Sequence, residues 1–561
     1  MYDTVIIGAG SAGGVLAARL SEDPTRSVLL LEPGPDYPDI ETLPPELKLG
    51  VGGSIDMETN LHNWDYRARG TDLSGPVIVP RGRATGGSSA INAQIFLRGV
   101  PEDYDSWAES GLDEWSYQKL LSAFRRSEND LDFGGDFHGK DGPISCVRPK
   151  REDCMPAQIA FHAACRAIGL PDCPDHNLPD STGVGPLAFN NVDGVRISTA
   201  VGYLAGARHR LNLTIRADSR VHRIVIEGGR AVGIVAESGG EMFEVCAGEV
   251  ILSAGAVVSP QLLMLSGIGP AEHLEEHGIG VIADVPGVGQ NLQDHPMVFM
   301  VWRTAPGYEY NFDQRRIQMA LRYTATGSPD RNDMIVYMMS LGTERPERGG
   351  DRNVPIGIQM NLVLNSADSR GEIRLTSTDI GDQPGIDFNY MSEPRDLARM
   401  RDGVRMMAVI GERPEFGDII TDMLMPPEDI VGDDGALDDW IRTDVTTGHH
   451  ISCTNTMGVD SNPLTVVDQL GAVRGVDGLR VIDASIMPTC VRANINATVI
   501  AMAERMAELI VRGCIKSISR PAWRDRRGDL AAGLMRGGRP GRQIGVSVQS
   551  VGLICHYRPP F

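Results

Sequence analysis

The first residues of the chain combine a glycine spacing and an acid in a pattern that can bind a dinucleotide. A short β-branched run leads into Gly8, Gly10 and Gly13, and then into a helix-like segment and a second apolar run that ends at Glu32. Gly8 permits a tight turn, Gly10 lets the backbone approach a pyrophosphate, and Gly13 lets the helix pack on the strand. Glu32 follows Gly13 by nineteen residues, where an acid can accept hydrogen bonds from both ribose hydroxyls. The pattern favours FAD or NAD over NADP.

A second segment, residues 80–92, is dense in glycine and serine. A flexible surface loop has the same composition. However, the apolar run at 95–97 and the pair Tyr104 and Trp107 follow directly, which ties the segment to packed structure. Small residues allow backbone N–H groups to point at a flat or anionic ligand, so we expect a second nucleotide contact here.

Five ordered blocks between residue 2 and about residue 512 resemble the GMC (glucose–methanol–choline) oxidoreductases. The blocks are the N-terminal fingerprint; Gly86-Gly87-Ser88-Ser89 to Asn92 with Arg98-Gly99; Gly255-Ala256 with Ser259-Pro260 and Ser266-Gly267-Ile268-Gly269-Pro270; His450 with Thr454, Met457 and Gly458; and Val481 to Ser485 with Met487-Pro488, Asn494, Asn496 and Glu504. The resemblance implies FAD as cofactor. It also implies an α/β fold (α+β overall), with a Rossmann-like FAD-binding domain and a substrate-binding domain whose antiparallel sheet is flanked by helices.

The same resemblance places the catalytic base at His450. Flavin-dependent oxidation of an alcohol needs a base for the hydroxyl proton, while the cofactor takes the carbon-bound hydride. Histidine suits this role because its unperturbed pKa is about 6.5. The chain has twelve histidines, so one histidine alone means little. The register of the following Thr454 selects His450 over its neighbour His449, which we expect at the flavin or the pocket wall.

The second catalytic position of the family falls on Asn494, with Asn496 as the alternative. An amide can orient the substrate oxygen but cannot act as a base at neutral pH. The last helix is expected to begin near Asn496, where its N-terminus would stabilise negative charge on the flavin. No metal is expected. The predicted cofactor contacts are Gly8, Gly10, Ser11, Gly13, Glu32, Trp64, Arg83, Thr85, Gly86, Ser88, Asn92, Ala93, Val221, His449, Asp483, Ala484 and Asn496.

Four positions depart from the family pattern. Some members attach FAD covalently through a histidine where this chain has Ile91, so noncovalent FAD is predicted. Thr85 replaces a usual aliphatic residue, Ile451 a common proline and Cys453 a common glycine. The last two leave the shape of the loop around His450, and with it the substrate, open. We interpret Cys453 as a packing thiol, with a reactive role as the alternative.

The domains are expected to interleave along the chain. The FAD-binding domain is assigned residues 1–155, 190–300 and 455–512, and the substrate-binding domain residues 156–189 and 301–454. Strands are expected at 4–7, 28–31, 213–217, 221–227, 232–237 and 250–253 in the first domain and at 334–341, 356–364 and 372–376 in the second.

The alternation of apolar residues along 356–364 predicts a strand with one apolar face, and the segments 334–341 and 372–376 are expected beside it. On the other face, Gln359 and Asn361 fit a solvated surface better than a substrate contact. Ordinary core filling is the preferred interpretation of Met334, Met338 and Met339, and an adaptable pocket wall the alternative.

The composition of the 561 residues is globular, with 42% hydrophobic and 23% charged residues. A net charge of −21 argues against a nucleic-acid partner. Residues 513–561 differ from the rest, because they carry nine basic and two acidic residues among scattered Gly and Pro. We expect this basic C-terminal extension to be weakly ordered, with packing on the acidic body as the alternative.

The nine cysteines include no C-x-x-C pair, so reduced thiols in a cytoplasmic protein are expected rather than disulfides or a zinc site. The N-terminus lacks the pattern of a signal peptide, and no uninterrupted apolar run reaches the roughly 18–20 residues that span a bilayer. The predicted location is the cytoplasm. A peripheral membrane contact and the oligomeric state are left open.

Taken together, these features predict FAD-dependent oxidation of a small or medium primary alcohol, of the choline, aryl-alcohol or aliphatic kind, to an aldehyde. The electron acceptor is oxygen or a quinone- or dye-type carrier, and no motif separates the two. One alternative is a non-redox use of the fold, as in a hydroxynitrile lyase or a flavin photodecarboxylase. Another is a flavin-bearing binding protein without turnover.

Overall fold

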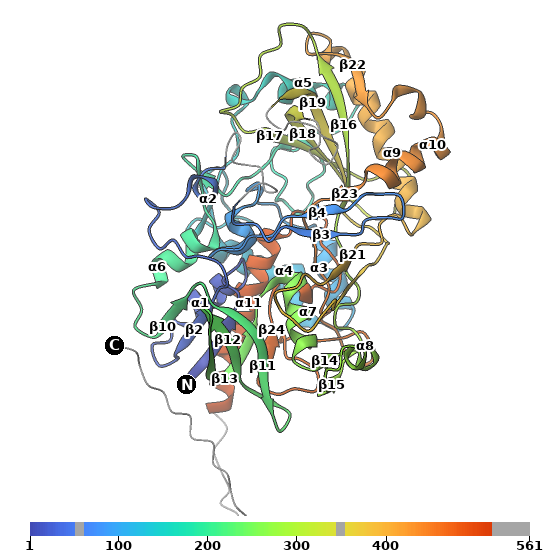
Figure 1. Ribbon diagram of the computed structural model, residues 1–561. Helices are drawn as coiled ribbons and strands as arrows, with labels where there is room; N and C mark the ends of the chain where they lie inside the picture. The colour runs from blue at the N-terminus through green and yellow to red at the C-terminus, as the bar shows by residue number, and fades with distance from the viewer. Residues whose placement is uncertain (51–60, 344–353, 519–561) are drawn as a thin grey trace, which may run out of the picture. The chain divides into compact units, whose positions relative to one another are not determined.

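The computed structural model describes residues 1–50, 61–343 and 354–518 (Figure 1). A seven-stranded sheet with a parallel core carries the N-terminal fingerprint. The strand order is β10-β2-β1-β13-β12-β11, with β24 paired to β13. The strands are β1 (Tyr2–Ile7), β2 (Val28–Leu31), β10 (Leu213–Arg216), β11 (Arg220–Glu227), β12 (Arg230–Ser238), β13 (Glu241–Leu252) and β24 (Leu479–Val481).

The central strands of this sheet are parallel because helices connect them. β1 pairs in parallel with β2 and β13, and α1 (Gly13–Leu20) joins β1 to β2. The strands β11, β12 and β13 form an antiparallel extension on one side. Two further helices pack near the carboxyl ends of the parallel strands, α7 (Gly255–Leu265) after β13 and α11 (Asn496–Ile518) at the end of the described chain. Ligands bind at these strand ends in open α/β sheets.

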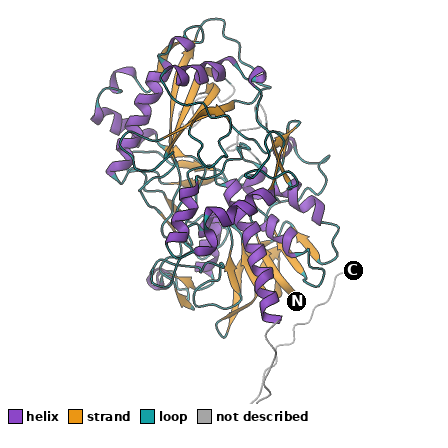
Figure 2. Ribbon diagram, turned by 180° about the vertical axis from the view of Figure 1, so that it is seen from behind, coloured by secondary structure: helices purple, strands orange, loops and turns teal. Residues whose placement is uncertain are grey.

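A second seven-stranded sheet is antiparallel, with the order β22-β16-β19-β18-β17-β7 and β23 paired to β16. The strands are β7 (Gly183–Pro186), β16 (Pro296–Thr304), β17 (Ile317–Tyr323), β18 (Met334–Thr343), β19 (Pro355–Leu364), β22 (Ile420–Met425) and β23 (Thr446–Thr447). The helices α5 (Pro156–Ala167) and α9 (Pro394–Gly411) contact its central strands, and α10 (Asp434–Asp444) packs on α9 (Figure 1, Figure 2). The mixed α/β class and the sheet flanked by helices are confirmed.

The antiparallel sheet corrects two expectations. The segment 372–376 does not lie beside β19, because β20 (Glu372–Arg374) pairs only with β21 (Gly385–Asp387) in a separate ribbon, while β16 and β18 flank β19. Gln359 and Asn361 are also not solvated, since their exposed fractions are 8% and 7%. They face an interior region on the side of the sheet away from α9. Polar residues at alternate positions of this strand therefore do not mark a solvent-exposed face.

The methionines of β18 divide between the two faces of the sheet. Met334 and Met338 are fully buried in the main core, as expected. Met339 lies on the same face as Gln359, its cross-strand partner, and its sulfur lies 3.0 Å from the Asn361 amide nitrogen. Core filling therefore describes two of the three residues.

Shorter elements lie between these strands along the chain. They include α2 (Pro45–Lys48), β3 (Tyr66–Ala68), β4 (Val77–Val79), α3 (Pro101–Glu109), α4 (Tyr117–Ser127), β5 (Glu128–Asp130), β6 (Ile144–Cys146), β8 (Asn191–Val192), β9 (Val195–Arg196), α6 (Ala205–Ala207), β14 (Ile268–Gly269), α8 (Ala271–Glu276) and β15 (Ala283–Asp284). α11 continues to Ile518, six residues past the predicted end of the FAD-binding domain. The rest of the predicted basic extension, 519–561, lies outside the described residues.

The seven cysteines that the structure describes are all free thiols, in agreement with the expected reduced state. None of the described helices is both long and apolar enough to cross a membrane. The predicted boundary at residue 300 falls inside β16. We propose the predicted domain ranges as the division between the two sheets, with this boundary moved to the start of β16.

Candidate active site

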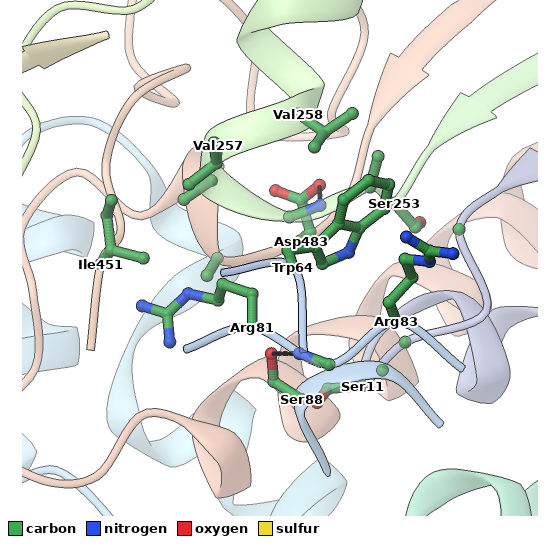
Figure 3. A pocket seen from close by; sticks show the side chains of 18 of the residues that line it. Ser11, Trp64, Arg81, Arg83, Ser88, Ser253, Val257, Val258, Ile451 and Asp483 are labelled. Atoms are coloured by element: carbon green, nitrogen blue, oxygen red, sulfur yellow. Dashed lines mark hydrogen bonds between the residues drawn. The ribbon is translucent and has the colours of Figure 1, made fainter. Parts of the chain in front are cut away.

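One cavity brings together residues that lie far apart in the sequence (Figure 3). Its volume is about 420 Å³, within the roughly 300–1,000 Å³ typical of cofactor sites. The walls come from the N-terminal glycine turn, the segment around residues 80–95, the start of α7, the loop at 448–451 and the start of α11. In Figure 3 the guanidinium of Arg81 points toward Ile451, while Trp64 and Arg83 lie toward the other end.

The glycine turn has the geometry that the fingerprint predicts. Gly8 has a φ of 98°, and a Cβ there would lie 2.5 Å from the Ser253 carbonyl oxygen. A Cβ on Gly13 would lie 1.9 Å from the Gly8 carbonyl oxygen, so Gly13 serves the packing of α1. Gly10 differs, because it lines the cavity and the nearest protein atom to its Cβ position, on Gly87, is 3.8 Å away. The open space at Gly10 suits a phosphate held close to the backbone.

Glu32 closes the same end of the cavity. Its carboxylate accepts hydrogen bonds from the backbone N–H groups of Ala9 and Gly34, both at 3.0 Å. Burial raises the pKa of Glu32 to about 7, although these two hydrogen bonds and Arg83 act in the opposite direction. The acid therefore sits at the end of β2 beside the glycine turn, with its remaining lone pairs available to a ribose.

The segment around residues 80–95 packs directly on the glycine turn. A Cβ on Gly87 would lie 2.6 Å from the Cα of Gly10, so the two glycine-rich segments touch. Ser88, Asn92 and Ala93 line the cavity, whereas Thr85 and Gly86 lie behind its wall. Gly86 has a φ of 100° and serves the turn itself.

Of the nineteen predicted site residues, sixteen line this cavity and three do not. The three are Gly13, Thr85 and Gly86. The sixteen are Gly8, Gly10, Ser11, Glu32, Trp64, Arg83, Ser88, Asn92, Ala93, Val221, His449, His450, Asp483, Ala484, Asn494 and Asn496.

His450 is held in place through its backbone. The chain enters from β23, and the Gly448 N–H donates to the His295 carbonyl at 2.7 Å. The His450 N–H donates to the Asp294 carboxylate at 2.6 Å, and the Thr447 hydroxyl donates to the same carboxylate at 2.5 Å. Asp294 precedes β16, so one short segment before that strand positions the whole loop.

The side chains of His450 and Asn494 meet at the cavity wall. The amide nitrogen of Asn494 lies 3.1 Å from the Nε2 atom of His450, and the Tyr337 hydroxyl donates to the Asn494 amide oxygen at 2.9 Å. The pKa of His450 is well below its usual value, mainly because the ring is buried. The nearby His295, His449 and Arg81 lower it further. His450 is therefore neutral at physiological pH, which leaves one ring nitrogen able to accept a proton.

The adjacent residues His449 and Asn496 take other positions. His449 has a φ of 70° and its carbonyl accepts a hydrogen bond from Arg81 at 3.1 Å. Asn496 begins α11 and accepts a hydrogen bond from the Ser11 hydroxyl at 2.8 Å, which links the helix start to the glycine turn. Of the two candidate asparagines, Asn494 is the one that contacts His450.

Asp483 holds the start of α7 at the cavity. Its carboxylate accepts a hydrogen bond from the Gly255 N–H at 2.9 Å and one from the Ser259 hydroxyl at 2.6 Å. Cys453 is fully buried and burial raises its pKa to about 12, which supports its interpretation as a packing thiol.

Three residues at this site were not predicted from the sequence, namely Arg81, His295 and Tyr337. Arg81 lines the cavity, and Tyr337 orients the amide of Asn494. His295 contacts His450 across 155 positions of sequence. The sequence gives little indication of this contact. His295 is one of twelve histidines, and no motif or spacing relates it to a histidine so far along the chain.

The GMC oxidoreductase family matches residues 2–297 with its N-terminal region and residues 367–503 with its C-terminal region. The chain belongs to this family. It is therefore an FAD-dependent oxidoreductase that acts on the CH–OH group of donors.

Relatives of known name match nearly the whole chain. It is 36% identical over 547 residues to an oxygen-dependent choline dehydrogenase of Photobacterium profundum, covering 93% of this chain and 95% of the relative. A second such enzyme, from Chromohalobacter salexigens, is 38% identical over 538 residues, covering 91% and 94%. Among solved structures, pyridoxine 4-oxidase from Mesorbium loti is 31% identical with a TM-score of 0.82, covering 91% of this chain and 99% of that one.

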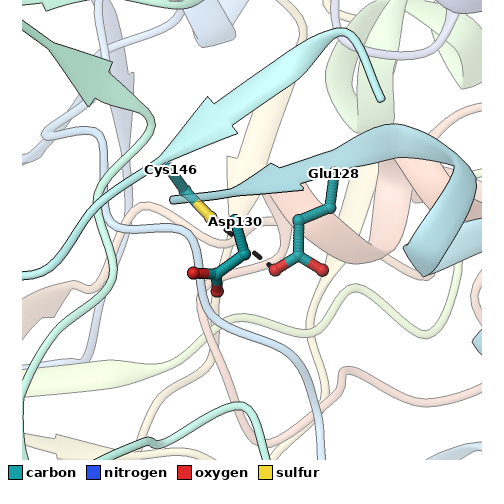
Figure 4. Close-up of side chains that lie close together, drawn as sticks. All are labelled: Glu128, Asp130 and Cys146. Carbon is teal, nitrogen blue, oxygen red and sulfur yellow. Dashed lines mark hydrogen bonds between the residues drawn. The ribbon is translucent and has the colours of Figure 1, made fainter. Parts of the chain in front are cut away.

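A separate buried cluster, formed by Glu128, Asp130 and Cys146, has the donor atoms of a metal site (Figure 4). Its acids are engaged by cations instead. His138 contacts Glu128 at 3.2 Å and Asp130 at 3.1 Å, and Arg148 bonds Asp130 at 2.8 Å. Hydrogen bonds to the surrounding carboxylates outweigh burial and raise the pKa of His138 to about 10. We therefore interpret the cluster as a charge-balanced ion network.

This network predicts a pH-dependent stability. Because the pKa of His138 is higher in the folded than in the unfolded state, its contribution is complete below about pH 6.5 and is lost as the pH rises toward 10. His138→Gln is expected to lower the unfolding free energy by about 3–5 kcal/mol at pH 7, because the buried carboxylates of Glu128 and Asp130 each lose one of their two cationic partners. Urea unfolding followed by circular dichroism from pH 6 to 10 measures both effects.

The matched control is His209→Gln, because His209 is exposed. It should retain the unfolding free energy of the parent and its decline with pH. If His138→Gln declines with pH as steeply as the parent, the proposed protonation of His138 is wrong.

Proposed function

We propose that this chain oxidises a primary alcohol to an aldehyde, with His450 as the base and Asn494 as the group that orients the substrate oxygen. The observation that supports this most is the 3.1 Å contact between Asn494 Nδ2 and His450 Nε2, at the wall of the cavity that also contains the glycine turn. A substrate hydroxyl near these two atoms can receive a hydrogen bond from the amide and give its proton to the imidazole.

The residues of the cavity fit FAD. Gly10 leaves space for a pyrophosphate, Glu32 lies where a ribose is bound, and the buried amide nitrogen of Asn496 has no hydrogen-bond partner among the described residues. We propose that the adenosine half is held near Glu32 and Val221 and the isoalloxazine ring near His449, Asn494 and the start of α11. Once bound, FAD supplies the acceptor for the hydride from the carbinol carbon.

We propose that the FAD is bound noncovalently. Ile91, at the position where some relatives have the linking histidine, lines the cavity with a hydrocarbon side chain that cannot form such a bond. Acid precipitation of the yellow protein should leave FAD in the supernatant. A flavin that stays with the precipitated chain would contradict this.

The surroundings of His450 suit the role of a base. Its loop is fixed by Asp294, and its low pKa keeps it unprotonated before the substrate arrives. Asn494 is fixed in turn by Tyr337. The chain's own contribution is therefore to hold a neutral imidazole and an oriented amide in a buried site, where both interact strongly with a developing alkoxide.

The substrate class is a primary alcohol of small or medium size. Relatives include oxygen-dependent choline dehydrogenases and a pyridoxine 4-oxidase, which oxidise alcohols of different charge and shape. Ile95, Ile451 and Ile495 add apolar surface to the wall near His450. We propose that the electron acceptor is oxygen or a quinone-type carrier.

The test is an alcohol panel that contains choline, pyridoxine, benzyl alcohol and short aliphatic alcohols. Each is mixed anaerobically with the holoenzyme, and then assayed with oxygen and with a dye acceptor. Bleaching of the flavin absorbance with formation of the matching aldehyde supports the proposal, and the two acceptors separate oxidase from dehydrogenase. A flavin that no alcohol bleaches, or an alcohol cleaved without bleaching, favours a non-redox function instead.

A further inference from the structure

The imidazole of His450 is part of a chain of buried contacts that leads away from the cavity. Its Nδ1 atom lies 2.9 Å from the Nδ1 atom of His295, and the two rings are nearly edge to face, 4.8 Å apart. On the other side of His295, Nε2 lies 3.1 Å from the sulfur of Cys490. That sulfur lies 3.8 Å from the carbonyl oxygen of His450, so the chain of contacts returns to its starting residue.

The partner of the Nδ1 atom of the proposed base, His450, is therefore an imidazole and not a carboxylate. The nearby carboxylate of Asp294 is already used, because it accepts from the His450 backbone N–H and from the hydroxyl groups of Thr447 and Tyr390. His295 is completely buried, and the exposed fraction of Cys490 is 9%. Solvent therefore does not replace these partners readily.

The hydrogen-bond pattern constrains where the protons lie. Two ring nitrogens at 2.9 Å share one proton, and a neutral imidazole carries a proton on only one nitrogen. For Nε2 of His450 to accept a substrate proton, Nδ1 must carry the hydrogen and donate it to His295. His295 then carries its own proton on Nε2, directed at the sulfur of Cys490, and the thiol hydrogen faces the His450 carbonyl.

We propose that His295 is a positioning residue that keeps His450 in the tautomer with an unprotonated Nε2 and that receives the Nδ1 proton when the substrate's proton arrives. In this arrangement, which rests on the proposed function, the thiol of Cys490 fixes the far side of the His295 ring. The substrate O–H bond breaks as the Nε2–H bond forms on His450. The Nδ1–H bond of His450 breaks as an Nδ1–H bond forms on His295, so one positive charge ends on His295.

The surroundings of the two rings favour this direction of transfer. The charged and ionisable groups that face His450, namely His295, His449 and Arg81, all oppose a positive charge on it. Around His295, the Asp294 carboxylate and the backbone carbonyls of Val491 and Asn365 stabilise one. Burial lowers the pKa of His295 to about 4, so both rings are neutral before the reaction and the charge on His295 is short-lived.

The experiment compares His295→Leu with His295→Asn. Leucine fills space but cannot accept a hydrogen bond, whereas the asparagine amide oxygen can take the place of Nδ1. The FAD content and visible spectrum report whether each variant keeps the site. The rate of anaerobic flavin reduction by an active alcohol is measured from pH 5 to 10, together with the downfield proton resonance of the ring–ring hydrogen bond in histidine-labelled oxidised holoenzyme.

His295→Leu is expected to keep FAD, lose the downfield resonance and reduce its flavin about 10–100-fold more slowly. The pH below which the rate falls should move higher, since leucine removes a ring that opposes a positive charge on His450. His295→Asn should recover only part of the rate, because its amide oxygen accepts the Nδ1 hydrogen bond but cannot take up the proton. Cys490→Ala should lose more of the rate than Cys490→Ser, because serine keeps an acceptor for the His295 N–H.

A rate within twofold of the parent and an unmoved pH limb for His295→Leu would overturn the proposal. A slower rate without a shift of the pH limb would also overturn it, because it would indicate a structural role only. If no alcohol bleaches the parent's flavin, the proposed function is wrong, and the resonance still decides whether the ring–ring hydrogen bond exists.

Discussion

His450→Ala is expected to lower the rate of alcohol-driven flavin reduction about 10²–10⁴-fold while FAD stays bound. Loss of a positioned general base has effects of this size. The imidazole contacts Asn494, but the loop that carries it is held by backbone hydrogen bonds to Asp294 and His295, so alanine should leave the cavity intact. Stopped-flow measurement of the flavin absorbance, with an alcohol identified in the panel, gives the rate constant.

The matched comparison is His449→Ala, which tests the adjacent candidate for the base. The substitution keeps the His449 backbone carbonyl, which accepts a hydrogen bond from Arg81, and leaves the contact between Asn494 and His450 in place. We expect a smaller loss of rate for His449→Ala than for His450→Ala. The reverse order would show that the base has been assigned to the wrong histidine.

Local sequence signals predicted the elements around the cofactor. The short apolar run before Gly8 predicted β1, and the acid at the end of β2 predicted the position of Glu32 beside the glycine turn. These signals work because a glycine turn, a helix and two strands follow one another within about thirty residues. The last helix was expected to begin near Asn496, and α11 begins at that residue.

The parts that the sequence did not predict depend on contacts between distant segments. The strands β16 and β17, which are buried in the antiparallel sheet, were not identified as strands. Gln359 and Asn361 were predicted to face solvent. The alternation of polar and apolar residues is the same whether the polar face is solvated or lies against the interior. The burial of both residues in the folded chain, and not the sequence pattern, separates the two cases.

The second imidazole, His295, shows the same limit within the site. The resemblance supplied His450 and Asn494, but His295 belongs to the segment that enters β16, and the approach of the loop at 448–450 brings the two rings together. Tyr337 reaches the same place from β18. Residues that position a catalytic group come from whichever elements happen to pack there, so sequence spacing gives little indication of them.

Gly10→Val is expected to produce a protein that folds but does not retain FAD. The nearest protein atom to a Cβ at Gly10 is 3.8 Å away, which is ordinary van der Waals contact, so the unfolding free energy of the apoprotein should change little. The added side chain instead occupies the open face of the turn, where the backbone is expected to approach the pyrophosphate. A clash there costs about 3 kcal/mol, so the Kd for FAD should rise roughly 100-fold.

Two further glycines make this prediction specific to the cofactor. Gly206 also has open space around its Cβ position but does not line the cavity, so Gly206→Ala should retain both stability and FAD. Gly13→Ala should instead destabilise the fold itself, because its Cβ would lie 1.9 Å from the Gly8 carbonyl oxygen. Thermal unfolding of each apoprotein and fluorescence titration with FAD separate the two effects. If Gly10→Val binds FAD as tightly as the parent, the pyrophosphate does not lie at this turn.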